Sequence, residues 1–349
     1  MSDTHELIRI ACDAIGVGNS DTDWKIVPTE HAEMFEEKAP SLAQNLRGSR
    51  PRGLAEMYEE WNAKAVRARD NFKNTVSKAD IAVFGTASLG ALLLVSGGLQ
   101  VLLGVSGPWV VRAIGLLGVI SSGLAVMWLN QLQGGALSKR WAEERAKAEA
   151  KRLAYFKTVM EEAKEAPLDQ LLALEYTRRF LLDNQIDYFK DRGGEHENAA
   201  GAALRTSTRA VFVSSSFTAI AGALSMWRPE FAVVAAVGVI ASAYAALAVS
   251  RSAVSQDRKN ADRYLAAEYE LKERRLDLDT YRQKTASGEN GAVQEFFEPI
   301  FLTLQADHRA FLSEAEQREL AIGNMEKRLD AAKEALKKKS ASEGDLATP

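Results

Sequence analysis

Four long stretches without a charged residue constrain this chain more than any other feature. Residues 81–111 form an uncharged run of 31, and residues 113–138, 210–227 and 231–250 form runs of 26, 18 and 20. Because a helix rises about 1.5 Å per residue, 18 residues reach roughly 27 Å, close to the thickness of a bilayer's hydrocarbon core. The sequence therefore predicts an all-α membrane protein with four transmembrane helices, at residues 81–104, 109–131, 210–227 and 231–249.

The four runs form two pairs, and each pair is joined by a short segment that contains proline. Residues 105–108 read Val-Ser-Gly-Pro, and residues 228–230 read Arg-Pro-Glu. Such segments favour turns over continued helix, so we expect two transmembrane hairpins. Trp109, Trp128 and Trp227 lie near the ends of the runs, where aromatic rings favour the membrane interface.

The positions of the basic residues predict the orientation of the hairpins. Only Arg112 and Arg228 lie in or near the two turns, whereas fourteen Lys and Arg residues lie near the other ends of the runs. Because positive charge favours the cytoplasmic side, we expect both termini and the central segment in the cytoplasm. The fourteen are Arg67, Arg69, Lys73, Lys78, Lys139, Arg140, Arg145, Lys147, Arg205, Arg209, Arg251, Arg258, Lys259 and Arg263.

Composition and spacing give no sign of catalysis. The net charge of −3, from 44 basic and 47 acidic residues, does not favour a nucleic-acid partner. Cys12 is the only cysteine, so an internal disulfide is impossible. The four histidines are scattered and none has a partner at metal-ligand spacing, which predicts no metal and no cofactor. We expect a protein that is not an enzyme.

The remaining segments read as cytoplasmic helices. We expect a small, loosely organised N-terminal region at residues 1–52, a first hairpin unit at 53–192, a second at 193–339 and a disordered tail at 340–349. The helical pattern from residue 53 continues without proline into the first run, which allows one long helix. Pro167 is expected to end one helix, and Gly193 and Gly194 to close the first unit. A break is expected near residues 287–291, before a helix that Pro299 begins or kinks.

Small residues recur at four-residue spacing within the runs. Helices in lipid associate through such residues, because close backbone approach and hydroxyl bonds favour contact there. The same residues could instead form a polar stripe along a pore. The candidates for helix packing or pore lining are Gly118, Ser122, Ser214, Ser215, Thr218, Gly222, Gly238 and Ser242. Gln100, Arg112 and Asn130 lie nearer the run ends, as interfacial anchors or as groups at a pore mouth.

A short motif follows each hairpin. Arg145 and Glu149 in the first half correspond to Arg258 and Asp262 in the second, and both segments read R-x-x-A followed by an acid. The match is consistent with a tandem duplication of hairpin, long helix, break and shorter helix. Chance similarity between two charged helices is the alternative.

These features resemble the SLATT domains, the two-transmembrane effector domains associated with the SMODS and SLOG proteins of bacterial conflict systems. The resembling segments are residues 61–72, the hairpin 81–131 and residues 141–156, and then the hairpin 210–250 and residues 258–281. The resemblance implies an oligomeric effector of the bacterial inner membrane that forms a pore or perturbs the bilayer. The chain departs from the family in having two hairpins where one is common, and in lacking a recognisable sensor domain.

The leading hypothesis is therefore a non-enzymatic, homo-oligomeric pore-forming or membrane-perturbing effector whose partners are the lipid bilayer and further copies of the chain. The alternative is a membrane-anchored scaffold, in which the apolar stripes at 58–76, 264–278 and 297–312 pack in the body or hold a cytoplasmic protein partner. A soluble helical protein with buried apolar helices is a third possibility, which an uncharged run of 31 residues disfavours.

Overall fold

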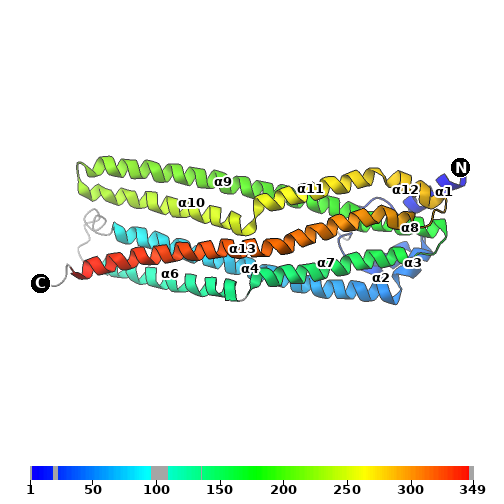
Figure 1. Cartoon of the computed structure of the whole chain (residues 1–349), viewed down its shortest axis with the longest axis horizontal. Helices are drawn as coiled ribbons and strands as arrows, with labels where there is room; N and C mark the ends of the chain where they lie inside the picture. The colour runs from blue at the N-terminus through cyan, green and yellow to red at the C-terminus, as the bar shows by residue number, and fades with distance from the viewer. Residues whose placement is uncertain (1, 19–22, 96–108, 135, 346–349) are drawn as a thin grey trace. The chain divides into compact units, whose positions relative to one another are not determined.

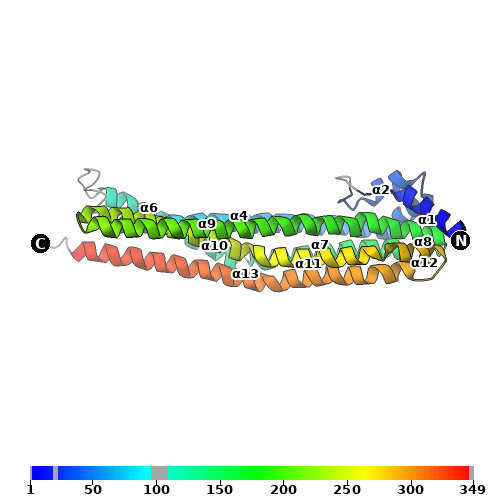
Figure 2. The ribbon, with the colours of Figure 1, turned by 90° about the horizontal axis from the view of Figure 1, so that it is seen from above.

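A computed structural model describes residues 2–18, 23–95, 109–134 and 136–345 of the chain (Figures 1 and 2). These residues contain helices and no strand, which confirms the all-α class. Gln100 and the first predicted turn, residues 105–108, lie outside the described residues.

The helices of the described part of the chain have the following bounds, in which η1 is a π-helix and η2 a 3-10 helix. They are α1 (Ser2–Ile15), α2 (Pro28–Phe35), α3 (Pro40–Leu46), α4 (Ser49–Leu94), α6 (Trp109–Gly134), α7 (Leu137–Glu161), α8 (Pro167–Thr177), η1 (Arg178–Asp183), α9 (Asn184–Ser225), η2 (Pro229–Val234), α10 (Ala235–Ser255), α11 (Asp257–Leu276), α12 (Leu278–Ala286) and α13 (Ala292–Asp345). The long helix α4 confirms that the amphipathic segment continues into the first uncharged run.

The chain folds as two compact units, and each draws on three segments. Unit 1 comprises residues 1–68, 140–196 and 259–314, and unit 2 comprises residues 69–139, 197–258 and 315–349. The units differ from the predicted blocks 53–192 and 193–339, because α4, α9 and α13 each contribute residues to both.

Unit 1 is built around one apolar core. Its largest fully buried side chains include Phe35, Phe156, Tyr176, Phe189 and Phe297, which come from five different helices. Two of the predicted apolar stripes face this core, through the buried residues Tyr264, Leu271, Leu278, Phe297, Ile300 and Leu304. The burial of these side chains from water is the main driving force for assembling the unit.

The N-terminal region is more ordered than expected. Its residues from α1, α2 and α3 belong to the same core, with Ala11, Ile15, Phe35 and Leu46 almost fully buried. The prediction of a loosely organised segment was wrong, because three short helices can each bury one face against a larger body.

The predicted breaks are confirmed at two places. Pro167 begins α8 directly after the extended residue Ala166, a position where the missing amide hydrogen costs nothing. Between α12 and α13, Gly288 and Gly291 adopt φ values of +79° and +82°, which glycine adopts without strain. Pro299 lies inside α13 and does not begin it.

Gly193 and Gly194 do not end a helix, which corrects the prediction. Both lie within α9, and a Cβ placed on Gly193 would lie 3.0 Å from Leu265 Cδ2 of α11. The absence of a side chain at residue 193 therefore serves close packing between two helices of unit 1. A glycine pair inside a helix costs some helix propensity, which tertiary packing can offset.

The C-terminal helix α13 is longer than expected and contributes to unit 2. Arg318, Ile322, Met325 and Leu329 are buried at spacings of four, three and four residues, the pattern of a helix packed along one face. Arg318 Nε donates to Ser138 Oγ at 2.8 Å. The helix continues to Asp345, so residues 340–345 are helical where a disordered tail was predicted, and residues 346–349 lie outside the described part.

Three helical stretches among the described residues are long and apolar enough to cross a membrane. They are Ser49–Leu93, Trp109–Glu161 and Ala235–Leu276. The predicted third span, 210–227, is not among them. Because α9 ends at Ser225, an 18-residue stretch that ends there must include the charged Arg209, which lowers its mean hydropathy. Ser214, Ser215 and Ser216 lower the mean hydropathy further.

The core of unit 1 provides a matched test on α13. Leu304 is fully buried, whereas Leu302, two residues earlier, is 53% exposed. Leu304→Ala is expected to lower the free energy of unfolding by about 2–5 kcal/mol, because it removes buried contacts and leaves a cavity. Leu302→Ala is expected to change it by less than about 0.5 kcal/mol. Denaturant unfolding in mild detergent, followed by circular dichroism, measures both, and equal effects would contradict the assigned core face.

His31 predicts a pH dependence of stability. Its Nδ1 lies 2.8 Å from the Tyr176 hydroxyl, and burial lowers the pKa of His31 to about 4 from about 6.5. Between about pH 6.5 and pH 4, His31 is therefore protonated in the unfolded chain and neutral in the folded chain. We expect a stability loss of up to about 1.4 kcal/mol per pH unit from this residue, present only below pH 6.5.

The variant His31→Gln isolates this contribution. Stability measured between pH 7 and 5 should fall less steeply for His31→Gln than for the unsubstituted chain. His5→Gln, which changes an exposed histidine of α1, should keep the original slope. Identical slopes for all three proteins would show that His31 is not held neutral by the fold.

Candidate functional site in the apolar helices

The candidate residues of the third and fourth runs meet where α9 packs against α10. The hydroxyls of Ser214 and Ser242 lie 2.6 Å apart, in a hydrogen bond that either can donate. A Cβ placed on Gly238 would lie 2.7 Å from Thr218 Oγ1 and 2.9 Å from the carbonyl oxygen of Ser214. The two helices therefore run antiparallel in close contact, with glycine where the backbones approach.

Two further candidates on α9 lie outside this contact. Ser215 and Gly222 are exposed, and a Cβ on Gly222 would meet nothing within 4 Å outside its own helix. In the described part of unit 2, α9 thus contacts α10 through one row of small residues, and the adjacent face with Ser215 and Gly222 is uncovered.

The contact between α4 and α6 includes a residue that the sequence analysis missed. Gly118 is buried and Ser122 is half-buried, but the hydrogen bond is made by Ser121, whose hydroxyl donates to the carbonyl oxygen of Ala82 at 2.9 Å. A Cβ on Gly85 would lie 2.8 Å from Ser121 Oγ. Four-residue spacing from Gly118 selects Ser122, and only the rotation of α6 against α4 distinguishes the two serines.

The candidates for the membrane interface lie on the surface. Arg112 and Asn130 are exposed at opposite ends of α6. Trp109 and Trp227 are also exposed, as expected of rings that anchor at an interface. Near the other end of α6, Lys78 Nζ lies 4.6 Å from the centre of the Trp128 ring.

Apolar side chains cover much of the outer surface of unit 2. Leu117 and Val119 on α6, Phe212 on α9 and Val249 on α10 are all about half exposed or more. Large apolar side chains exposed in this number favour contact with lipid or with another protein.

An ion pair joins two of the apolar helices and was also missed. Arg251 Nε of α10 donates to Asp80 Oδ2 of α4 at 2.9 Å, and the Asp80 side chain is almost fully buried. Each residue borders an uncharged run, so the pair lies at the ends of the runs and fixes α4 beside α10. Charge-assisted hydrogen bonds of this kind are stronger than neutral ones.

The two copies of the R-x-x-A-acid motif have different surroundings. Arg145 pairs with Glu149 at 2.7 Å, and the buried Glu149 is also 2.7 Å from Arg152 and 3.5 Å from His308. Arg258 and Asp262 are exposed. In the second half, it is Arg263, with a side chain 12% exposed, that pairs with Asp307 and Glu314 of α13.

The described residues contain no group of three or more His, Cys, Asp or Glu side chains placed to hold a metal ion. What they provide is close helix packing, apolar surface and buried ion pairs. The chain matches no protein-family model, no curated protein and no solved structure. The site must therefore be interpreted from its own geometry.

Gly238 offers a direct test of the α9–α10 contact. Gly238→Ala places a methyl group against the backbone of Ser214, and we expect a loss of about 1–3 kcal/mol in stability from overpacking. Gly222→Ala, on the open face of α9, should be neutral or slightly stabilising, since alanine favours helix. Thermal unfolding of both variants in mild detergent measures the difference, and equal sensitivity would contradict the contact.

Proposed function

We propose that this chain is a non-enzymatic membrane protein that self-associates and forms a pore or perturbs the bilayer. The exposed apolar faces of α6, α9 and α10 support contact with lipid. The resemblance to SLATT domains is the reason for assigning it to a bacterial conflict or defence system. The same resemblance favours the bacterial inner membrane as its location.

The C-terminal part of α13 is the observation that carries the pore proposal. Its apolar face is buried, and its outer face carries the exposed residues Glu319, Lys327 and Asp330. Gln133 Nε2, at the end of α6, donates to Glu326 Oε2 at 2.9 Å. In both views the end of α13 lies at the same end of unit 2 as the connection between α9 and α10 (Figures 1 and 2).

When a helix with a charged face packs beside membrane helices, few environments can accommodate that face. Charged side chains at bilayer depth face a protein interior or a water-filled cavity, because hydrocarbon excludes them. A ring of subunits meets this requirement when the α13 faces surround a central water path and the apolar helices face outward. This arrangement assigns the pore lining to α13, while Ser214, Thr218, Gly238 and Ser242 hold α9 against α10.

The uncovered face of α9 supports self-association. Ser215 and Gly222 are small and exposed, and lipid chains gain little from contact with them. Small residues on a membrane helix favour close approach of a second helix. In the proposed ring, a neighbouring subunit covers this face of α9.

The proposed topology has four apolar spans, with the N-terminus and unit 1 in the cytoplasm. Its support is the excess of Lys and Arg at one end of the runs. Because α13 crosses the membrane in the proposed ring and ends beside the connection between α9 and α10, this topology places the C-terminus on the other side, which revises the expectation of two cytoplasmic termini. The close contact of α9 with α10 favours both crossing together, since their paired hydroxyls satisfy one another.

The scaffold alternative has weaker support. Of the stripes offered for a partner, residues 264–278 and 297–312 place Tyr264, Leu271, Leu278, Phe297, Ile300 and Leu304 in the core of unit 1, where a partner cannot reach them. Replacement of residues 210–227 by a plain leucine-alanine helix separates the two functions. A scaffold should keep working after this change, whereas a pore that depends on α9 should not.

Ion flux from liposomes carrying the purified chain tests the proposal. We expect conductance, and we expect Lys327→Glu to raise the cation-to-anion permeability ratio by about two- to fivefold, because a negative group then faces the water path. Lys190→Glu makes the same charge change on an exposed residue of unit 1 and should leave the ratio unchanged.

Two results would count against the pore. Conductance at background under every condition that makes the chain toxic to cells would exclude it. An equal change of selectivity in Lys327→Glu and Lys190→Glu would remove α13 from the water path.

A further inference from the structure

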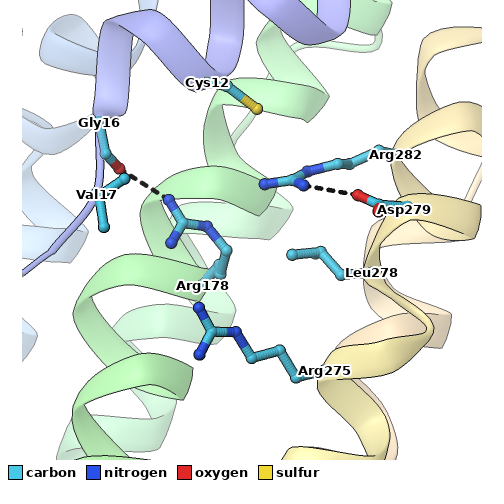
Figure 3. A pocket seen from close by; sticks show the side chains of 8 residues that line it. All are labelled: Cys12, Gly16, Val17, Arg178, Arg275, Leu278, Asp279 and Arg282. Carbon is cyan, nitrogen blue, oxygen red and sulfur yellow. Dashed lines mark hydrogen bonds and ion pairs between the residues drawn. The ribbon is translucent and has the colours of Figure 1, made fainter.

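An arginine-lined cavity lies in unit 1, among α1, η1, α11 and α12. Its volume is about 330 Å³, at the lower end of the range for small-molecule sites. Arg178, Arg275 and Arg282 line it together with Asp279 and Cys12 (Figure 3). The sequence analysis assigned no role to any of these residues.

Arg178 is held rigidly in the cavity wall. It belongs to the π-helix η1, a local irregularity that often occurs at functional sites. Its Nε donates to Glu175 Oε2 at 2.7 Å, its Nη1 to Asp183 Oδ2 at 2.6 Å and its Nη2 to the carbonyl oxygen of Gly16 at 2.9 Å. Its side chain is only 6% exposed.

Arg282 is fixed by the same buried carboxylate. Its Nε and Nη2 donate to the two oxygens of Glu175 at 2.6 and 2.9 Å, and its Nη1 donates to Asp279 Oδ1 at 2.7 Å. Glu175 is 1% exposed and binds both arginines from behind the cavity wall. The two guanidinium groups therefore keep their places without a ligand.

Arg275 is the arginine with donors to spare. Its Nε lies 3.3 Å from Asp183 Oδ1, which leaves the N–H groups of its two terminal nitrogens towards the cavity. Its side chain is about half exposed, so it can adjust to a ligand. A guanidinium has five N–H donors in a planar fork that matches carboxylate and phosphate oxygens.

The donors of the wall, more than its net charge, favour an anion. Three guanidinium groups and the Asp279 carboxylate line the cavity, while Glu175 and Asp183 pair with the same arginines from outside the lining, so three carboxylates balance the three arginines. The Asp279 carboxylate is 84% exposed and largely solvated. Leu278 and Val17 add apolar contact beside the charges.

We propose that this cavity binds a small organic phosphate, with the phosphate on Arg275 and Arg178 and the organic part against Leu278 and Val17. The phosphate oxygens match the unused N–H groups of the Arg275 fork, and charge-assisted hydrogen bonds of this kind are strong. The site is independent of the membrane function proposed above, because all of its residues belong to unit 1.

Cys12 provides the readout. It is the only cysteine and it lines the same cavity, where burial raises the pKa of its thiol. The rate at which a thiol reagent labels Cys12 in the full-length chain in detergent therefore reports occupancy. Phenyl phosphate is the probe, benzyl alcohol is the uncharged control, and sodium chloride matches the ionic strength.

We expect phenyl phosphate to slow labelling and benzyl alcohol to leave it unchanged. Arg275→Gln should raise the concentration of phenyl phosphate that gives half-protection at least about tenfold, because it removes the guanidinium fork with unused donors. The half-protecting concentration for Arg275→Lys should lie between those of Arg275→Gln and the unsubstituted chain, since lysine keeps the charge and lacks the planar fork. Arg274→Gln removes the same charge from the adjacent exposed residue, outside the cavity, and should protect like the unsubstituted chain.

Two results would overturn the proposal. One is the absence of protection by phenyl phosphate up to about 10 mM, a range that covers dissociation constants of about 1 mM and below. The other is equal protection in Arg275→Gln and Arg274→Gln. Either result would leave the arginines as structural ion pairs that hold α1 and α12 on α8 and η1.

Discussion

The exposed apolar surface of unit 2 is the constraint on which the rest of this structure depends. Helices satisfy their own backbone hydrogen bonds, so long uncharged helices can leave water for lipid at no cost to the backbone. α6, α9 and α10 expose apolar side chains, whereas unit 1 buries most of its aromatic residues in a core. One chain thus combines a unit with an enclosed core and a unit whose helices are apolar on the outside.

Polar groups specify how the apolar helices pair. Burying leucine against leucine gains little in lipid, so specific contacts must determine which helix faces which. Ser214 with Ser242 joins α9 to α10, Ser121 with Ala82 joins α4 to α6, and Asp80 with Arg251 joins α4 to α10. The charged outer face of α13 then restricts the surroundings of the unit, because that face requires water.

Local patterns in the sequence predicted local structure well. The all-helical class, the continuous α4, the breaks at Pro167 and at residues 287–291, and the buried stripes on α11 and α13 all follow from periodicity and turn chemistry. The failures concern contacts between distant segments. Gly193 was taken as a helix end because its packing against Leu265 is invisible in a single sequence. The choice between Ser121 and Ser122 likewise depends on a helix rotation.

The same limit applies to the charged residues. Arg178 and Arg282 looked like members of ordinary charged helices, and only the fold places both on Glu175, 107 residues before Arg282. Asp262 matched Glu149 by sequence, yet Asp262 is exposed where Glu149 is buried. The neighbouring Arg263 forms the ion pair with Asp307 of α13 instead. A charge pattern predicts a helix face, whereas its burial depends on which segment covers that face.

Spin labels report most directly whether unit 2 lies in lipid. In a chain with Cys12→Ser, single cysteines at positions 117 and 212 would carry the labels in liposomes, and position 327 would carry one on the charged face of α13. Dissolved oxygen reaches lipid-facing labels more readily than a water-soluble nickel complex does. The account predicts high oxygen and low nickel accessibility at 117 and 212, with the opposite at 327. Nickel-accessible labels at 117 and 212 would contradict it.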